Sequence, residues 1–225
     1  MRAKIAAFTL VLGVLGGCRE RDAARQAPEQ APTPLLQPRR LKEPSPEDFR
    51  VRFETTQGRF EVEVHRAWAP RGADRFYNLV KNGYYDGNRV YRVIAGTLAQ
   101  WGVNGDPRIN AVWKEAYIVD DSVTHSNRRG RIAFAQGGLH TRTTVVFVNL
   151  RDNPSLDERY APFGEVVQGM DTLDRFYSDY GDGPPRGDGP YQARAEALGE
   201  SYFAEQFPKL DSITKAEILP EGGSR

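Results

Sequence analysis

Hydrophobic and polar residues alternate along the chain from residue 51. In the run RFEVEVH, residues 59–65, the hydrophobic residues Phe60, Val62 and Val64 take every second position, and the residues between them are charged or polar. Successive side chains of a strand point to opposite faces, so this pattern predicts a strand with one buried face. The run VRFETT precedes it across a Gln-Gly pair, and the two runs together predict a β-hairpin.

The spacing of hydrophobic residues changes after Pro70 to that of a helix. Proline favours the first turn of a helix, and Gly83 suits the position just past its end. The hydrophobic residues between these two positions recur at helical spacing, which predicts an amphipathic helix with one buried face. These residues are Ala73, Phe76, Tyr77 and Val80.

The rest of the chain predicts many short strands and few helices. A second helix is expected at 170–178, and a further helical stretch at 191–207. This content is typical of a closed antiparallel barrel or of a β-sandwich. The expected strands are 88–95, 98–101, 130–136, 145–150 and 163–167.

Composition and charge restrict the classes of partner. The chain has 225 residues, of which 39% are hydrophobic, and this is enough for one sizeable core. Its 31 basic and 30 acidic residues give a formal net charge of +1. Proteins that bind nucleic acid through phosphate contacts carry a basic excess, so the charge balance argues against a nucleic-acid partner. We expect a partner that is recognised by its shape.

The first residues have the features of an export signal. A basic start is followed by the hydrophobic run 5–15, which is too short to span a bilayer, and by the small residues of LGGC, ending at Cys18. This segment resembles the lipobox of bacterial lipoproteins, which implies removal of residues 1–17 and a lipid on Cys18. Because Arg19, and not aspartate, follows the cysteine, the resemblance implies an anchor in the outer membrane that faces the periplasm. An ordinary signal peptide with an incidental cysteine is the alternative.

The domain boundaries follow from composition. Residues 18–46 are rich in proline, glutamine, alanine and charge and lack a sustained hydrophobic period, so we expect a disordered linker there. The folded domain is expected at 47–220, with a tail at 221–225. A flexible linker of this length reaches roughly 30 Å on average, which allows the domain to act at some distance from the lipid.

Two polar residues interrupt a hydrophobic segment of the predicted sheet. In VYRVIAGTLAQWG, residues 90–102, Arg92 and Gln100 lie within runs that otherwise predict buried strands. On alternation alone, an arginine at this position points to solvent as readily as to a binding site. The local pattern does not decide between the two.

A longer segment around these residues resembles a known family. The run NLVKNGYYDGNRVYRVIAGTLAQWG, residues 78–102, resembles the signature of the cyclophilin family of peptidyl-prolyl isomerases, and matching blocks follow at 130–150, 155–171 and 212–219. The resemblance implies a mainly β fold: an eight-stranded antiparallel barrel capped by two helices. An extra C-terminal helical segment would precede the last strand. Substrate would lie in a groove on the outer wall of the barrel.

The resemblance also assigns the candidate site residues. Arg92 corresponds to the family's catalytic arginine, which acts on the X-Pro amide without a metal or cofactor. Gln100 corresponds to the glutamine that binds the substrate backbone and supports the arginine. For the apolar candidates, a purely structural place in the core is the alternative. The other substrate-binding candidates are Leu98, Thr97, Ala135, Gln136, Phe147, Leu156 and Tyr160.

Several positions depart from the family pattern. Thr97 replaces a phenylalanine that packs on the proline ring, Val145 replaces a second substrate-binding glutamine, and Tyr160 replaces a histidine. One apolar ring and one hydrogen bond are together worth roughly 2–4 kcal/mol of binding. We therefore expect a thinner proline pocket and weaker activity.

The resemblance and the departures from it predict two alternative functions. The first is a peptidyl-prolyl cis-trans isomerase that helps exported proteins fold, with proline-containing peptides or unfolded exported proteins as partners and the membrane reached through the lipid. The alternative is a catalytically weakened module that binds peptides or an envelope partner. The three histidines lie far apart in sequence and show no ligand spacing, so no metal site is expected. The run GDGPPRGDGP, at 181–190, predicts a loop only.

Overall fold

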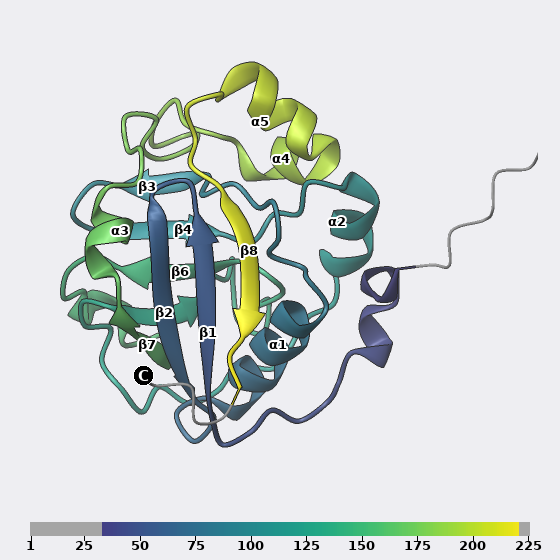
Figure 1. Cartoon of the computed structure of the whole chain (residues 1–225), viewed down its shortest axis with the longest axis vertical. Helices are drawn as coiled ribbons and strands as arrows, with labels where there is room; N and C mark the ends of the chain where they lie inside the picture. Colours follow the sequence, from purple (N-terminus) through teal and green to yellow (C-terminus); the bar gives the residue numbers. More distant parts are fainter. Residues whose placement is uncertain (1–32, 221–225) are drawn as a thin grey trace, which may run out of the picture. The chain divides into compact units, whose positions relative to one another are not determined.

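The computed structural model describes residues 33–220, and its strands form one antiparallel sheet (Figure 1). The strands are β1 (Asp48–Thr55), β2 (Gly58–His65), β3 (Arg92–Ile94), β4 (Leu98–Trp101), β5 (Arg131–Phe134), β6 (Val146–Asn149), β7 (Pro162–Gln168) and β8 (Ile213–Ile218). Their order in this eight-stranded sheet is β3-β4-β6-β5-β7-β2-β1-β8. The predicted eight-stranded antiparallel architecture is confirmed.

The sheet curls until its two edges approach each other. Backbone hydrogen bonds join the segment before β3 to the start of β8: Val90 N donates to Asp211 O at 2.9 Å, and Ile213 N donates to Asn88 O at 2.8 Å. These bonds give partners to backbone groups that an open sheet edge would leave unpaired. Of the two architectures that the strand pattern allows, the curled sheet is the one formed.

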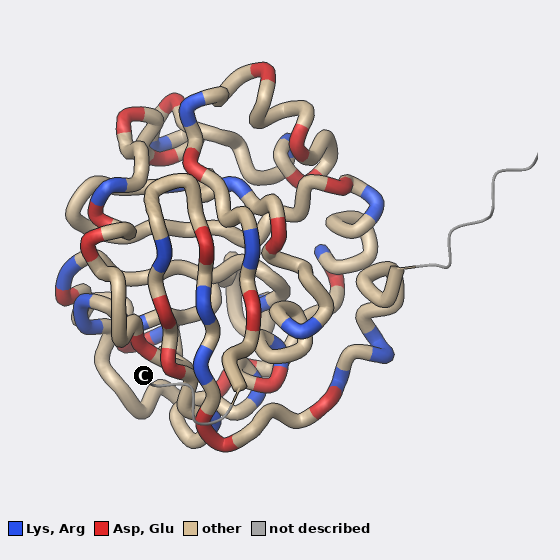
Figure 2. The backbone as a smooth tube through the Cα atoms, in the orientation of Figure 1, with Lys and Arg blue, Asp and Glu red and all other residues tan. Residues whose placement is uncertain are grey.

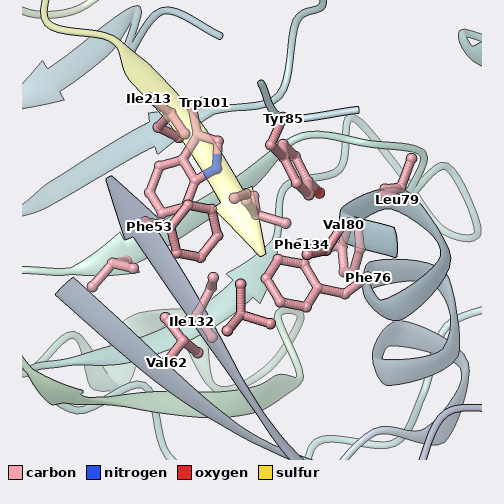
Figure 3. Packing of buried hydrophobic residues seen from close by; sticks show 14 of the residues in the cluster. Phe53, Val62, Phe76, Leu79, Val80, Tyr85, Trp101, Ile132, Phe134 and Ile213 are labelled. Atoms are coloured by element: carbon pink, nitrogen blue, oxygen red, sulfur yellow. The ribbon is translucent and has the colours of Figure 1, made fainter. Parts of the chain in front are cut away.

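The hairpin of β1 and β2 forms the centre of the hydrophobic core (Figure 3). Phe53 and Phe60 are opposite each other in the register, and their rings stack with centroids 4.7 Å apart. Trp101 of β4 packs against the Phe53 ring in an edge-on arrangement at 5.6 Å. Phe60, Val62 and Val64 are fully buried, as the alternation predicted. Full burial of one such side chain contributes about 1.5–3 kcal/mol.

Two helices cover the curled sheet. Helix α1 (Pro70–Lys81) packs against β8, β7 and β2, and the short helix α3 (Met170–Asp174) packs against β2 (Figure 1). Helix α1 begins at the predicted proline, and Gly83 follows its end with a φ of +70°, a conformation that favours glycine. Helix α3 is shorter than predicted. Of the predicted hydrophobic face of α1, the buried residues are Ala73, Phe76 and Val80.

The C-terminal insertion, residues 181–211 before β8, contains two helices, α4 (Gln192–Leu198) and α5 (Glu200–Gln206). They form the helical stretch predicted for this region, and Gly199 separates them with a φ of +63°. Helix α4 lies beside α2 (Pro107–Trp113), which the sequence pattern did not predict (Figure 1). The insertion has its own hydrophobic cluster against the sheet, made of Tyr91, Val103, Val145, Ala195, Tyr202, Phe203, Phe207 and Leu210.

The folded part of the chain begins earlier than the predicted boundary at residue 47. Residues 33–46, expected as part of a disordered linker, form two short 3-10 turns and pack on the domain. Leu35 is 6% exposed, and Trp113 Nε1 donates to its carbonyl oxygen at 2.8 Å. Farther along, Ser45 N donates to Asp74 Oδ1 at 2.9 Å. The linker prediction is wrong for this stretch because its hydrophobic partners come from distant helices.

Other predictions for the ends of the chain lie outside the described residues. These are the signal peptide 1–17, the lipid on Cys18, and the tail 221–225. Among residues 33–220, no helix is long and apolar enough to cross a membrane.

Strands β1, β2 and β8 carry charged residues of both signs (Figure 2). Arg52 Nη2 lies 2.9 Å from Glu61 Oε1 on the neighbouring strand, and Arg50 Nη2 lies 3.1 Å from Glu63 Oε1. Opposite charges facing each other across strands stabilise the pairing. These strands therefore carry no single-sign patch.

Candidate functional site

The register of three neighbouring strands brings the two polar residues of the hydrophobic segment together. Arg92 of β3 lies opposite Gln100 of β4, and Gln100 lies opposite Phe147 of β6. Directly opposed residues of adjacent strands share one face of a sheet. The alternate residues Val93 and Ala99 are buried in the core on the other face. The arginine is therefore on the outer wall of the curled sheet.

A groove of about 750 Å³ runs along this outer wall. All the predicted site residues except Thr97 line it. The opposite side of the groove comes from the C-terminal insertion, including the loop 181–190. From the sheet side, the predicted residues that line it are Arg92, Leu98, Gln100, Ala135, Gln136, Phe147, Leu156 and Tyr160.

A small hydrophobic pocket lies within the groove next to Arg92. Phe147, 3% exposed, forms its floor, and the Tyr160 ring packs edge-on against it with centroids 5.5 Å apart. Leu98 and Leu156 belong to the same cluster. This cluster is separate from the main core. Its apolar walls suit a small hydrophobic ring such as that of proline.

Ala135 and Gln136 continue the groove from the end of β5. Ala135 N donates to Val145 O at 2.9 Å, and both residues line the groove. Gln136 Nε2 donates to Arg159 O at 3.3 Å, while Gln136 Oε1 accepts no hydrogen bond from the described residues.

The two departures that were expected to thin the pocket lie in different places. Thr97 is in the turn between β3 and β4 and does not line the groove; its carbonyl oxygen accepts a hydrogen bond from Leu150 N at 2.9 Å. Val145 does line the groove, but it is 5% exposed and packs in the hydrophobic cluster with Phe203 of α5. The expected gap at Val145 is therefore filled by the C-terminal insertion.

An acidic residue from the insertion contacts Arg92 directly. Arg92 Nε donates to Asp182 Oδ1 at 2.7 Å, and Nη2 donates to Asp182 Oδ2 at 3.1 Å. The hydrogen bond and the positive charge of Arg92 lower the pKa of Asp182 from its ordinary value. Asp182 was not among the predicted site residues, because it lies in a glycine- and proline-rich loop that shows no hydrophobic periodicity.

Gln100 holds the other side of the guanidinium. Arg92 Nη1 donates to Gln100 Oε1 at 3.0 Å, and Gln100 Nε2 donates to the Tyr91 hydroxyl at 2.7 Å. The Tyr91 hydroxyl in turn donates to Oε1 of Gln192 in α4 at 2.9 Å. The arginine is thus connected to the C-terminal insertion on two sides. Tyr91 and Gln192 were not among the predicted site residues.

The order of these elements along the chain matches a known family. The model of the cyclophilin type peptidyl-prolyl cis-trans isomerase family matches residues 50–191, which include the sheet side of the groove. The chain belongs to this family. Family membership makes it a peptidyl-prolyl cis-trans isomerase.

Individual cyclophilins support the assignment. The chain is 32% identical to peptidyl-prolyl cis-trans isomerase-like 3 of Rhizopus delemar over 134 residues, which are 55% of this chain and 79% of that protein. It is 30% identical to peptidyl-prolyl cis-trans isomerase ppi1 of Schizosaccharomyces pombe over 133 residues, 56% of this chain and 83% of that protein. These relatives are matched over most of their own length.

Solved structures show the same fold. A crystal structure of a cyclophilin type peptidyl-prolyl cis-trans isomerase of Cryptosporidium parvum superposes with a TM-score of 0.58 at 22% identity, covering 77% of this chain and 99% of that one. A structure of that protein in the presence of the dipeptide Ala-Pro gives a TM-score of 0.57 at 21% identity. The family match ends at residue 191, so helices α4 and α5 lie beyond it.

Proposed function

We propose that Arg92 is the catalytic residue of this cyclophilin and that the pocket around Phe147 binds the substrate proline. An X-Pro amide rotates over a barrier of about 18–20 kcal/mol because its resonance must be broken. In the twisted state the prolyl nitrogen regains a lone pair. A guanidinium N–H that donates to this nitrogen stabilises the twisted state more than the planar one, which accelerates rotation in both directions.

The observation that carries this proposal is the row of Arg92, Gln100 and Phe147 across three paired strands, facing one groove. It places a cation that is 19% exposed in the same groove as the apolar pocket around Phe147. The side chain is only partly solvated, so its hydrogen bonds are stronger than in bulk water. The structure determined with Ala-Pro belongs to a cyclophilin of the same fold and supports a proline-containing substrate here.

Substitution of the arginine tests the proposal. Arg92→Ala should lower kcat/KM for an X-Pro tetrapeptide by on the order of 10²-fold, because a transition-state interaction is lost. Arg128→Ala is a matched control, since Arg128 is exposed, has no ion-pair partner among the described residues and does not line the groove. An Arg92→Ala variant with the wild-type rate and an unchanged circular dichroism spectrum would contradict the assignment.

We further propose that this isomerase acts on exported proteins from a lipid anchor in the outer membrane, facing the periplasm. The support is in the sequence: a basic start, a short hydrophobic run and the small residues that end at Cys18. Since the folded part begins by residue 33, the tether between the lipid and the domain is shorter than residues 18–46. Unfolded exported proteins expose X-Pro bonds whose rotation takes tens to hundreds of seconds without catalysis.

A further inference from the structure

The C-terminal insertion contributes a side chain to the immediate surroundings of Arg92. A guanidinium has five N–H groups. Asp182 accepts one from Nε and one from Nη2, and Gln100 accepts one from Nη1. One N–H on each of the two Nη atoms therefore stays available for a substrate in the groove. The carboxylate occupies the edge of the guanidinium that Nε and Nη2 form.

We propose that Asp182 is a positioning residue for the isomerase reaction, an inference that rests on the proposed catalytic role of Arg92. Its two oxygens fix the plane of the guanidinium, which a long and flexible side chain does not hold by itself. A bidentate contact of this kind sets both the position and the orientation of an arginine. The two remaining N–H groups then stay directed at the prolyl nitrogen during rotation.

Hydrogen bonds within its own loop fix the position of Asp182. Gly183 N donates to Asp182 Oδ1 at 2.9 Å, and Gly189 N donates to Asp182 O at 2.9 Å. The backbone approaches itself so closely here that a Cβ on Gly189 would lie 2.7 Å from Tyr180 O. Glycine is therefore required for the fold of this loop. Asp182 therefore lies in a compact turn that is closed by hydrogen bonds within the loop.

The base of the loop is anchored to the sheet. Tyr202 and Phe203 of α5 pack in the hydrophobic cluster with Tyr91 and Val145, the neighbours of the groove. Tyr202 also accepts a hydrogen bond from Tyr191 N at 3.1 Å, just after the loop. The insertion thus packs on Val145 and also supplies Asp182 to the arginine.

Substitution of the carboxylate in the full chain tests the proposal. Asp182→Ala should lower kcat for an X-Pro tetrapeptide by on the order of 10-fold, with KM little changed, because misorientation of a catalytic group acts on the transition state. Asp182→Asn can still accept from Nε but no longer from Nη2, so its kcat should be intermediate. Asp188→Ala is the control: this acidic residue lies in the same loop, is exposed and does not line the groove.

A spectroscopic readout separates positioning from a structural role. The Arg92 Nε–H should give an NMR signal protected from exchange in the wild type and in Asp188→Ala, and should lose that protection in Asp182→Ala. Thermal unfolding of each variant shows whether the domain stays folded. The isosteric Asp182→Asn variant keeps the test available if Asp182→Ala unfolds.

The outcomes distinguish this inference from the proposed function. If Arg92→Ala retains the wild-type rate, the proposed catalytic role of Arg92 fails, and the inference fails with it. If Arg92→Ala loses activity while Asp182→Ala keeps the wild-type kcat, only the positioning role is overturned. If Asp182→Ala is faster than the wild type, the carboxylate competes with substrate for the arginine, which also overturns positioning.

Discussion

The hydroxyl group of Tyr91 donates a hydrogen bond to Oε1 of Gln192 at 2.9 Å and accepts one from Gln100. It connects the residue next to Arg92 with a helix that lies outside the family match. The ring of Tyr91 is held separately by the Phe203 ring, with centroids 6.1 Å apart. The hydroxyl can therefore be removed without removing the packing.

We expect Tyr91→Phe to lower kcat/KM by about 3- to 10-fold, the effect of one hydrogen bond that supports Gln100. The measurement is isomerisation of an X-Pro tetrapeptide by the full chain. Tyr177→Phe is the matched control, since the Tyr177 hydroxyl makes no hydrogen bond within residues 33–220. Equal rates for the two variants would show that the Tyr91 hydroxyl does not support the site.

Phe147 at the floor of the pocket should affect catalysis more than stability. Phe147→Leu removes ring surface that would contact the substrate proline, so kcat/KM should fall by on the order of 10-fold. Phe134→Leu makes the same change in the main core, where Phe134 is 1% exposed. This control should lower the melting temperature and leave kcat/KM unchanged while the protein is folded. A reversed pattern would place Phe147 in the core instead of the substrate site.

Restoring the family's glutamine at Val145 should not raise activity. Val145 is 5% exposed and packs against the insertion, so Val145→Gln would bury an amide among hydrophobic residues. The free energy of unfolding should fall by about 1–3 kcal/mol. Val167→Gln, at a site that is 42% exposed, should change it by less than about 0.5 kcal/mol. Urea unfolding measures both, and a stable, faster Val145→Gln variant would contradict this account of the groove.

Leu35 should stabilise the domain although it lies in a proline-rich segment. Leu35→Ala removes a buried side chain beside Trp113, and the free energy of unfolding should fall by about 2 kcal/mol. Leu198→Ala, at a site that is 46% exposed, is the matched control and should be nearly neutral. Denaturant unfolding of the full chain provides the comparison. Equal stability of the two variants would mean that residues 33–46 do not contribute to the fold.

The proposed lipid anchor predicts the location of the protein. Cys18→Ser removes the thiol that would carry the lipid, so the variant should move from the membrane fraction to the soluble extracytoplasmic fraction. Its isomerase rate should equal that of the wild type, because the groove lies in the folded domain. Retention of the variant on membranes after a salt wash would contradict the anchor.

The sequence by itself determined the elements whose signal is local. The alternation around Phe60 predicted the hairpin, and Pro70 and Gly83 predicted α1. The family signature around Arg92 predicted a candidate site on the sheet. Each of these signals depends on residues that are close together in the chain. Alternation alone did not decide whether the Arg92 side chain faces bulk solvent or a groove. The prediction that it faces a groove came from the family resemblance.

Only the tertiary structure decided which distant residues complete these local elements. Asp182 contacts Arg92 across 90 positions of sequence, and Trp113 donates a hydrogen bond to the carbonyl of the buried Leu35 across 78 positions. The composition of these two segments, a loop and a linker, predicts neither contact, because neither segment shows a hydrophobic periodicity that would indicate a buried face. Whether a residue at such a position is buried depends on the distant segment that packs against it. Only the tertiary structure brings the two segments together, so the local sequence does not predict the contact.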